Sequence, residues 1–288
     1  MPEGDKIYRA ARTLHRALAG QTVTRFVAEL APLAQVDRAE PIAGRTIERV
    51  EAAGKHCLMT FSGPPDGLVL RTHMRMNGSW HIYRPGESWQ MPARAMRILI
   101  ETADWVAVAF NVYVAEFVGA ADLDRHGPVA TLGPDLLGDF DAERALTRIG
   151  EQGARPVHEV LLNQRVMAGL GNVYKSELLF LSKLHPDTPA SAVTEPAWRE
   201  LMALAQKLLR ANVADGAAPG IVTYRGLRRT TGRMNPEDRL WVYSRGGQPC
   251  RTCGTPIASR KDGDAARVTY WCPNCQSQPR GHEGTKIY

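Results

Sequence analysis

The first twenty residues of the chain carry a helical pattern of apolar positions. Every third or fourth residue of this stretch is apolar, as on the buried face of an amphipathic helix. These apolar residues are Ile7, Ala10, Ala11, Leu14 and Leu18. The spacing predicts a helix over residues 5–19, with Asp5 as its N-cap and Gly20 as its stop signal.

From residue 21 to about residue 120, the hydrophobic pattern changes to short runs that are typical of β-strands. Clusters of glycine and proline separate these runs, as expected for turns. The expected strands include Val23–Phe26, Thr46–Val50, Cys57–Phe61, Leu68–Arg71, Arg97–Glu101 and Trp105–Phe110. Many short strands with regular turn signals predict a β-sandwich or a barrel.

Helical patterns return in the second half of the chain. We expect helices after Asp139, after Pro156, after Asn172 and over residues 197–211. The stretch 212–236 is rich in glycine, arginine and threonine, and we expect it to be a loop.

Four of the five cysteines lie in two Cys-x-x-Cys pairs near the C-terminus. Cys250 and Cys253 are followed by eighteen residues and then by Cys272 and Cys275. Four thiolates at this spacing are typical of a closed tetrahedral zinc site. We therefore expect one structural Zn²⁺, since no coordination position is left open for water or substrate. Cys57 stands alone, so the pattern does not indicate a disulfide scaffold.

These patterns predict an α+β multidomain protein with five parts. The parts are an N-terminal β-sandwich domain with helices over residues 1–121, a linker over 122–139, a helical domain over 140–236, a zinc ribbon over 237–279 and a tail over 280–288.

The composition favours an anionic partner. The 288 residues include 36 Lys and Arg against 30 Asp and Glu, which gives a net charge of +6. This suits a polyanion, although many soluble enzymes are equally basic. No apolar run reaches the length of a membrane span, and residues 1–20 lack the apolar core of a signal peptide. We expect a cytoplasmic protein that has no membrane partner.

The N-terminus carries a candidate nucleophile. Removal of Met1 would leave the secondary amine of Pro2 beside the carboxylate of Glu3. A secondary amine can attack an aldehydic carbon and form an iminium, while a neighbouring carboxyl group can donate and accept protons. Many proteins start with Met-Pro, so this signal is weak when taken alone.

Two segments of the strand-rich region contain side chains suited to nucleic acid. Lys55 follows a glycine and can reach a phosphate, although a solvated surface lysine is the simpler interpretation. In the segment His73–Gly78, Met76 is a candidate wedge into a base stack, and Arg75 and Asn77 can fill the gap left by an extruded base. Methionine is more often a core residue.

The sequence Gly169-Leu170-Gly171-Asn172 precedes a helical pattern. The two glycines allow the backbone to approach a ligand closely, and Asn172 is expected to be the N-cap. A capped helix N-terminus with an accessible backbone binds anions. The alternative is a turn between two helices without a ligand.

In this order, the segments resemble the formamidopyrimidine-DNA glycosylase/endonuclease VIII family along nearly the whole chain. The resemblance rests on Pro2–Asp5, Gly54–Lys55, His73–Gly78, Gly169–Asn172 and the hairpin Arg267–Cys275. It implies a β-sandwich domain joined to a helix–two-turns–helix domain with a zinc finger. Double-stranded DNA with damaged bases or abasic sites would lie in the cleft between the domains, bound to a monomer.

The resemblance also implies a role for each matching residue. Pro2 attacks C1′ of the damaged nucleotide, and Glu3 protonates the sugar ring oxygen. Lys55, which belongs with these catalytic residues, contacts a DNA phosphate, and Asn172 and Arg267 hold the phosphates beside the lesion. The remaining DNA-binding residues would be His73, Arg75, Met76 and Asn77, with Met76 filling the gap left by the base. Loss of the base and β,δ-elimination would then cut the strand.

The resemblance leaves the lesion open. The start Pro2-Glu3-Gly4 looks more like endonuclease VIII, which removes oxidised pyrimidines, and the whole pattern looks most like actinobacterial members of that branch. The tip Arg75–Asn77 is more similar to the oxidised-purine branch. Two alternatives remain: a lyase that acts only on abasic sites, and a non-catalytic zinc-ribbon DNA-binding protein that would need neither Pro2 nor Glu3.

Overall fold

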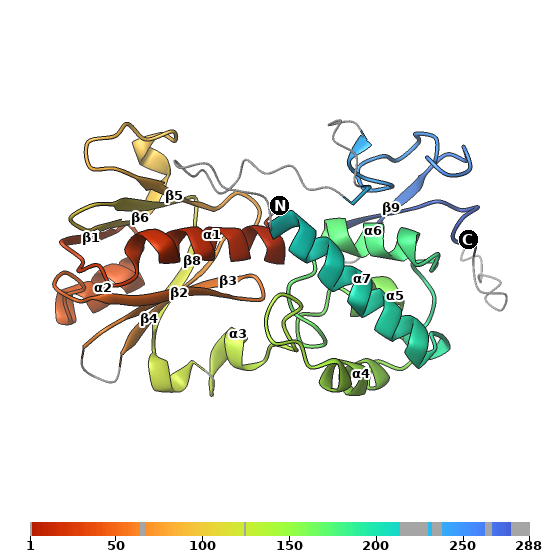
Figure 1. Cartoon of the computed structure of the whole chain (residues 1–288), viewed down its shortest axis with the longest axis horizontal. Helices are drawn as coiled ribbons and strands as arrows, with labels where there is room; N and C mark the ends of the chain where they lie inside the picture. Colours follow the sequence, from red (N-terminus) through yellow and green to blue (C-terminus); the bar gives the residue numbers. More distant parts are fainter. Residues whose placement is uncertain are drawn as a thin grey trace.

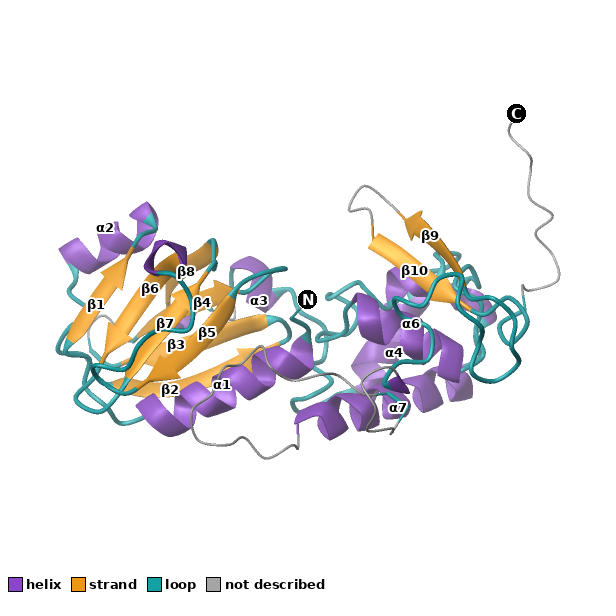
Figure 2. Ribbon diagram, turned by 90° about the horizontal axis from the view of Figure 1, so that it is seen from above, coloured by secondary structure: helices purple, strands orange, loops and turns teal. Residues whose placement is uncertain are grey.

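The computed structural model describes residues 2–63, 67–123, 125–213, 230–231, 238–262 and 267–277. It has two bodies side by side, with most of the β-strands on the left of Figure 1 and most of the helices on the right. Helix α1 (Gly4–Leu18) lies along the β-rich body, and the N-terminus of the chain lies where the two bodies meet (Figures 1 and 2). The first residues of the chain therefore stand between the two bodies.

The β-rich body consists of two antiparallel four-stranded sheets. In the order of pairing, the first sheet contains β1 (Arg25–Ala28), β6 (Met96–Glu101), β7 (Val106–Phe110) and β5 (Ser79–Tyr83). The second contains β2 (Ile47–Ala53), β3 (His56–Phe61), β4 (Leu68–His73) and β8 (Val114–Gly119). A separate helix, α2 (Ala31–Ala39), follows β1.

The two central strands of the second sheet, β3 and β4, are buried on both faces, which explains why their residues do not alternate strictly between polar and apolar. Met59 and Phe61 of β3 belong to the main core together with Ile7 and other residues of α1. Leu58, which precedes Met59, packs with Leu123 on the other face, in a cluster that also includes partly buried residues of the 120–129 stretch. A strand covered on both sides does not alternate between polar and apolar residues.

The elements that the hydrophobic pattern did not predict include α2, β5 and β8, and the short helix α3 (Gly127–Ala130) in the stretch predicted to be a linker. Strand β5 carries buried polar side chains that satisfy one another. His81 accepts or donates hydrogen bonds with both Ser79 and Tyr83, each over 2.9 Å. Because these polar groups are paired inside the body, they can be buried at low cost, and they alternate with the core residues Trp80 and Ile82 in place of a continuous apolar run.

The helical body has its own core. Helices η2 (Ala120–Asp122) and α3 pack on the β-rich body and lead to the helical one. The elements of the helical body are α4 (Ala142–Gly150), α5 (Val157–Val160), α6 (Asn172–Leu181), η3 (Ala190–Ala192) and α7 (Glu195–Val213). Helix α6 is central, and nine of its ten residues are buried. Most of the loop predicted over 212–236 lies outside the described residues.

A two-stranded hairpin of β9 (Ala258–Asp262) and β10 (Arg267–Trp271) packs against α6. The buried carboxylate of Glu177 on α6 accepts hydrogen bonds from the backbone N–H groups of Trp241, Val242 and Tyr243. The ring of Phe180 stacks on Trp241 at 5.5 Å. The hairpin module is thus attached to the helix that begins at Asn172.

Two predicted N-caps are wrong. Helix α1 begins at Gly4 with Glu3 in the cap position, and Asp5 lies inside the first turn. Helix α6 begins at Asn172, and its cap residue is Gly171. The side chains of Asp5 and Asn172, which were predicted to be the caps, instead contact segments that are distant in the sequence, as described below. No helix in the described part of the chain is long and apolar enough to cross a membrane.

Candidate active site and DNA-binding surface

The carboxylate of Glu3 occupies the N-terminus of α6. The side chain is fully buried, and it accepts hydrogen bonds from the backbone N–H groups of Val173 at 2.9 Å and Tyr174 at 3.4 Å. The first N–H groups of a helix have no partner within the helix, and the helix dipole favours an anion there. The anion-binding turn predicted from the glycines therefore exists, and its occupant is a carboxylate of the chain itself.

Two glycines make this contact possible. A Cβ atom on Gly171 would lie 2.4 Å from Cγ and Cδ of Glu3. A Cβ atom on Gly4 would lie 2.9 Å from Cα of Gly169, and the Gly4 N–H donates to the Gly169 carbonyl over 2.9 Å. A side chain at position 4 would push the start of α1 away from the backbone of Gly169, and a side chain at position 171 would displace the Glu3 side chain.

Asp5 adds a third tie between the two helices. Its buried carboxylate accepts a hydrogen bond of 3.1 Å from the hydroxyl of Tyr174. Together with the Glu3 and Gly4 contacts, this bond holds the first turn of α1 against the first turn of α6. Pro2, which is half-buried, directly precedes this anchored turn.

The turn that carries Lys55 is packed against the same segment. Gly54 has φ +58°, a conformation that favours glycine, and its Cβ position lies 3.1 Å from Cβ of Ala168. The Gly54 N–H donates to the Asp135 carboxylate over 2.6 Å. Burial raises the pKa of that carboxyl group, and hydrogen bonds from backbone N–H groups oppose the rise. Asp135 thus fixes the Lys55 turn beside the Gly169–Asn172 segment.

A cavity of about 670 Å³ opens at this turn. Lys55, His56 and His73 line one side of it, and residues of the helical body line the other. Burial, with the positive charges of nearby residues, lowers the pKa of His56 to about 3 and that of His73 to about 4. The Nδ1 atom of His73 accepts the N–H of Arg75 over 3.1 Å, so the proton of the neutral ring is on Nε2. His73 is therefore a neutral hydrogen-bond donor.

The tip after β4 exposes a large apolar side chain. Met76 is 63% exposed, which excludes the core position that is usual for methionine. Arg75 adopts φ 47°, and Arg75 and Asn77 are exposed beside Met76. Tyr113 is equally exposed at 63%, and it precedes Val114, the strand partner of His73. The tip and the Tyr113 loop therefore leave the sheet at the same end.

Asn172 connects α6 to the hairpin. Its Nδ2 donates to the carbonyl of Val268 over 2.8 Å, while its buried Oδ1 has no hydrogen-bond partner in the described residues. Arg267, the neighbour of Val268, is exposed. The buried Lys175, one helical turn along α6, donates to the hydroxyl of Thr269, and burial lowers its pKa to about 8. Asn172 and Arg267 are thus brought to one place.

The four predicted metal ligands also come together. The sulfur atoms of Cys250, Cys253, Cys272 and Cys275 all lie within 4.8 Å of one another. Those of Cys253 and Cys272 are 3.5 Å apart, and those of Cys250 and Cys275 are 4.0 Å apart. A tetrahedral Zn²⁺ with bonds of about 2.3 Å would place its sulfur ligands about 3.8 Å apart. The residues therefore fit one zinc ion with no open coordination position.

Comparison with known proteins decides the family. Residues 1–112 match the formamidopyrimidine-DNA glycosylase N-terminal domain, residues 132–222 its H2TH domain, and residues 247–278 a zinc finger found in FPG and IleRS. The chain belongs to the formamidopyrimidine-DNA glycosylase/endonuclease VIII family. This confirms the resemblance, the fold class and the zinc site predicted from the sequence.

Several relatives of this family cover nearly the full chain. A probable endonuclease 8 2 of Streptomyces coelicolor is 42% identical and spans 99% of this chain and 97% of its own. A DNA-(apurinic or apyrimidinic site) lyase Nei2 of Mycolicibacterium smegmatis is 36% identical, with coverage of 96% and 99%. A solved complex of Lactococcus lactis Fpg with abasic-site DNA has a TM-score of 0.78 at 22% identity, covering 96% of this chain and all of that one.

Within this family fold, the structure brings together Glu3, the Lys55 turn and the Gly169–Asn172 segment, and it joins Asn172 to the hairpin of Arg267. The roles of these residues, and the domain boundaries, stay predictions. The sequence analysis missed Asp135, Tyr113 and Lys175. Of these three, only Tyr113 could have been found from the sequence. It follows Asn111, a typical turn residue, so it was a candidate for an aromatic side chain exposed at a turn.

Proposed function

We propose that this protein is a bifunctional DNA glycosylase and abasic-site lyase of base excision repair, and that it removes oxidised bases, chiefly pyrimidines, from duplex DNA. The observation that carries the proposal is the Glu3 carboxylate at the N-terminus of α6, immediately after a proline that can become the N-terminal residue. The family supports an enzyme of this class, and its actinobacterial relatives support a bacterial, cytoplasmic protein acting at the nucleoid.

The chemistry begins with the free secondary amine of Pro2. The amine attacks C1′ of the damaged nucleotide, and the base leaves with the electron pair of its bond to C1′ and takes up the proton that the amine loses. Glu3 then gives a proton to the ring oxygen as the bond from C1′ to that oxygen breaks and the sugar opens. The product is an iminium between Pro2 and C1′. Because the iminium withdraws electrons, the C2′ proton becomes removable and the 3′ phosphate leaves. A second elimination, with loss of the 5′ phosphate, releases the sugar from the DNA.

The DNA is held by groups from three segments. Lys55, Asn172 and Arg267 bind phosphates beside the lesion, and such contacts fix the register of the protein on the DNA. Asn172 has an unpartnered buried Oδ1 and one amide hydrogen beyond its bond to Val268, so it is not saturated by the protein. Met76, with Tyr113 from the adjacent loop, inserts where the extruded nucleotide leaves the stack.

Borohydride trapping tests the proposal. The processed protein is mixed with duplexes that contain thymine glycol, dihydrouracil, 5-hydroxyuracil, 8-oxoguanine or an abasic site, and the covalent product is measured. Protein with an uncleaved N-terminal extension is the control, and we expect it to bind DNA without being trapped. Trapping by the blocked protein would contradict the role of Pro2.

The same panel separates the alternatives. Trapping on oxidised pyrimidines supports the proposed glycosylase. Trapping on abasic DNA alone would identify a lyase without base excision, and trapping chiefly on 8-oxoguanine would place the protein in the oxidised-purine branch. Binding without any trapping would indicate a non-catalytic DNA-binding protein.

A further inference from the structure

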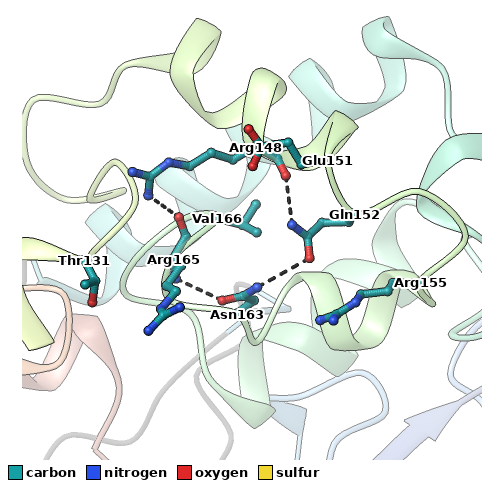
Figure 3. Close-up of a pocket in the computed structure, with 8 residues that line it drawn as sticks. All are labelled: Thr131, Arg148, Glu151, Gln152, Arg155, Asn163, Arg165 and Val166. Carbon is teal, nitrogen blue, oxygen red and sulfur yellow. Dashed lines mark hydrogen bonds between the residues drawn. The ribbon is translucent and has the colours of Figure 1, made fainter.

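A second pocket lies on the helical body, outside the residues considered so far (Figure 3). It is formed by the C-terminal part of α4, the turn after it and the turn before α6. Its lining residues are Thr131, Arg148, Glu151, Gln152, Arg155, Asn163, Arg165 and Val166. Its volume is about 650 Å³, which is comparable to that of the cavity beside Lys55.

A network of hydrogen bonds fixes the wall of this pocket. Asn163 accepts the N–H of Arg165 over 3.1 Å and donates to Gln152 over 3.5 Å, and Gln152 donates to the carbonyl of Arg148 over 3.1 Å. The guanidinium of Arg148 donates to the carbonyls of Leu132 and Arg165. These bonds are drawn in Figure 3, except the one to Leu132, and they hold both turns in place.

Two arginines at this pocket are not used by the fold. Arg155 and Arg165 are exposed, and their guanidinium groups form no ion pair or hydrogen bond within the described ranges. Glu151 is the acidic residue that lines the pocket. Arginine guanidinium groups match phosphate oxygens through paired hydrogen bonds, so two unpaired arginines on a fixed wall suit a phosphate backbone.

The pocket continues the cavity beside Lys55. Thr131, Asn163 and Arg165 line both of them. The shared residues make one groove that starts at Lys55 and His73 and runs along the helical body to Arg155. A ligand in this groove would extend from the candidate lesion site, which favours a long polyanion over a small one.

We propose that this groove binds backbone phosphates of the DNA duplex on one flank of the lesion, through Arg155 and Arg165. The proposal rests on the function proposed above, because it takes the DNA to start at Lys55. Binding here does not depend on the base sequence or on the lesion, since it involves only phosphates. It gives the protein a grip on undamaged DNA and adds length to its footprint.

The double variant Arg155→Gln/Arg165→Gln tests this proposal, with Arg12→Gln/Arg16→Gln on α1 as the control of equal charge. All four side chains are exposed, so both variants should fold. Two lost phosphate contacts should reduce the slope of log K against log salt by about 1.8. Between 50 and 200 mM salt, the affinity of the wild type should therefore fall about 12-fold more than that of the variant. The control should follow the wild type.

Duplex length gives the second arm of the experiment. The weaker affinity and smaller salt slope of Arg155→Gln/Arg165→Gln should be present on duplexes with two long flanks. Both differences from the wild type should disappear when the flank that occupies the groove is shortened to the lesion. Equal affinity and salt slope for variant and control, or a defect that persists whichever flank is removed, would overturn the proposal. So would loss of inorganic phosphate binding with unchanged DNA binding, which would indicate a small-anion site.

Borohydride trapping on a saturating concentration of the short duplex separates this proposal from the proposed function. We expect the variant to be trapped as the wild type is. If the double variant is trapped normally and also has the salt slope of the wild type, the groove proposal is rejected and the proposed function is kept. Absence of trapping in the wild type rejects the proposed chemistry, whatever the salt slope shows.

Discussion

A methyl group at position 171 tests whether the position of the Glu3 carboxylate controls base excision. Gly171 has φ −132° and ψ −162°, an extended conformation that alanine adopts without strain. Its Cβ atom, however, would lie 2.4 Å from Cγ and Cδ of Glu3 and 2.7 Å from Oε1. Gly171→Ala therefore acts on Glu3 through contact, and not through the backbone.

The size of the effect follows from these distances. Ordinary contacts of a Cβ atom begin at 3.4 Å, so the Glu3 side chain must move by about 1 Å. A displacement of this size in a catalytic group can lower the rate about 100-fold. The shift also weakens the bonds to the N–H groups of Val173 and Tyr174, and the overpacking costs about 1–3 kcal/mol of stability.

Single-turnover kinetics provide the measurement. We expect Gly171→Ala to remove an oxidised pyrimidine about 100-fold more slowly than the wild type while binding the same duplex. Cleavage of a preformed abasic site should fall much less, because no base has to leave. Gly150→Ala is the control, since a Cβ atom there meets nothing within 4 Å. A Gly171→Ala protein that is folded and excises at the wild-type rate would refute the reasoning.

Four further predictions concern Glu3, the exposed Met76, the zinc cluster and the histidines beside Lys55. Glu3→Gln should lose base excision much more than abasic-site cleavage, and equal loss in the two assays would assign Glu3 to both steps. Met76→Ala should weaken binding more on well-paired lesions than on mismatched or abasic duplexes in titrations, because it removes a wedge that offsets unstacking. Chelation of zinc or Cys272→Ser should weaken DNA binding, measured by titration, without changing which bonds are cut on a sequencing gel. Acid should destabilise the fold: the pKa values of His56 and His73 lie at about 3 and 4 against 6.5 in the unfolded chain, so their contribution is complete above pH 6.5 and is lost as the pH falls. At pH 5, denaturant unfolding should show a loss of about 2 kcal/mol from the buried His56 and a smaller loss from the partly exposed His73, whose charge is screened by solvent. His73→Gln should remove the smaller contribution.

Elements that depend on local pattern were predictable from the sequence. The helix expected over 5–19 is α1 at Gly4–Leu18, and the helix expected after Asn172 is α6. The four cysteines form the expected cluster because short Cys-x-x-Cys turns bring each pair of thiolates together, and the β9–β10 hairpin then joins the two pairs. In each case, the residues that define the element are close in the sequence or follow a fixed spacing.

Elements defined by distant partners were not predictable in this way. Strand β8 is only half-buried and contains Glu116, so its pattern is weak; it is ordered by pairing with β4, in which Arg71 binds Glu116 over 2.7 Å. The wrong N-caps have the same origin. Asp5 and Asn172 are typical cap residues, but their side chains form hydrogen bonds with residues far away in the sequence. Asp5 accepts from the hydroxyl of Tyr174, and Asn172 donates to the carbonyl of Val268. A tertiary partner then overrides the local preference.

The Gly169–Asn172 turn shows how a correct chemical signal can have an unexpected meaning. Its glycines and the following helix do form an anion site, as predicted, yet Glu3 from the other end of the chain fills it. The catalytic carboxylate that we propose is therefore positioned by the helical body, although it belongs to the β-rich one. Gly4 and Asp5 make the same connection. The proposed nucleophile and its acid are thus held in place only when both bodies have folded and docked, which links the chemistry to the junction where the DNA is expected to lie.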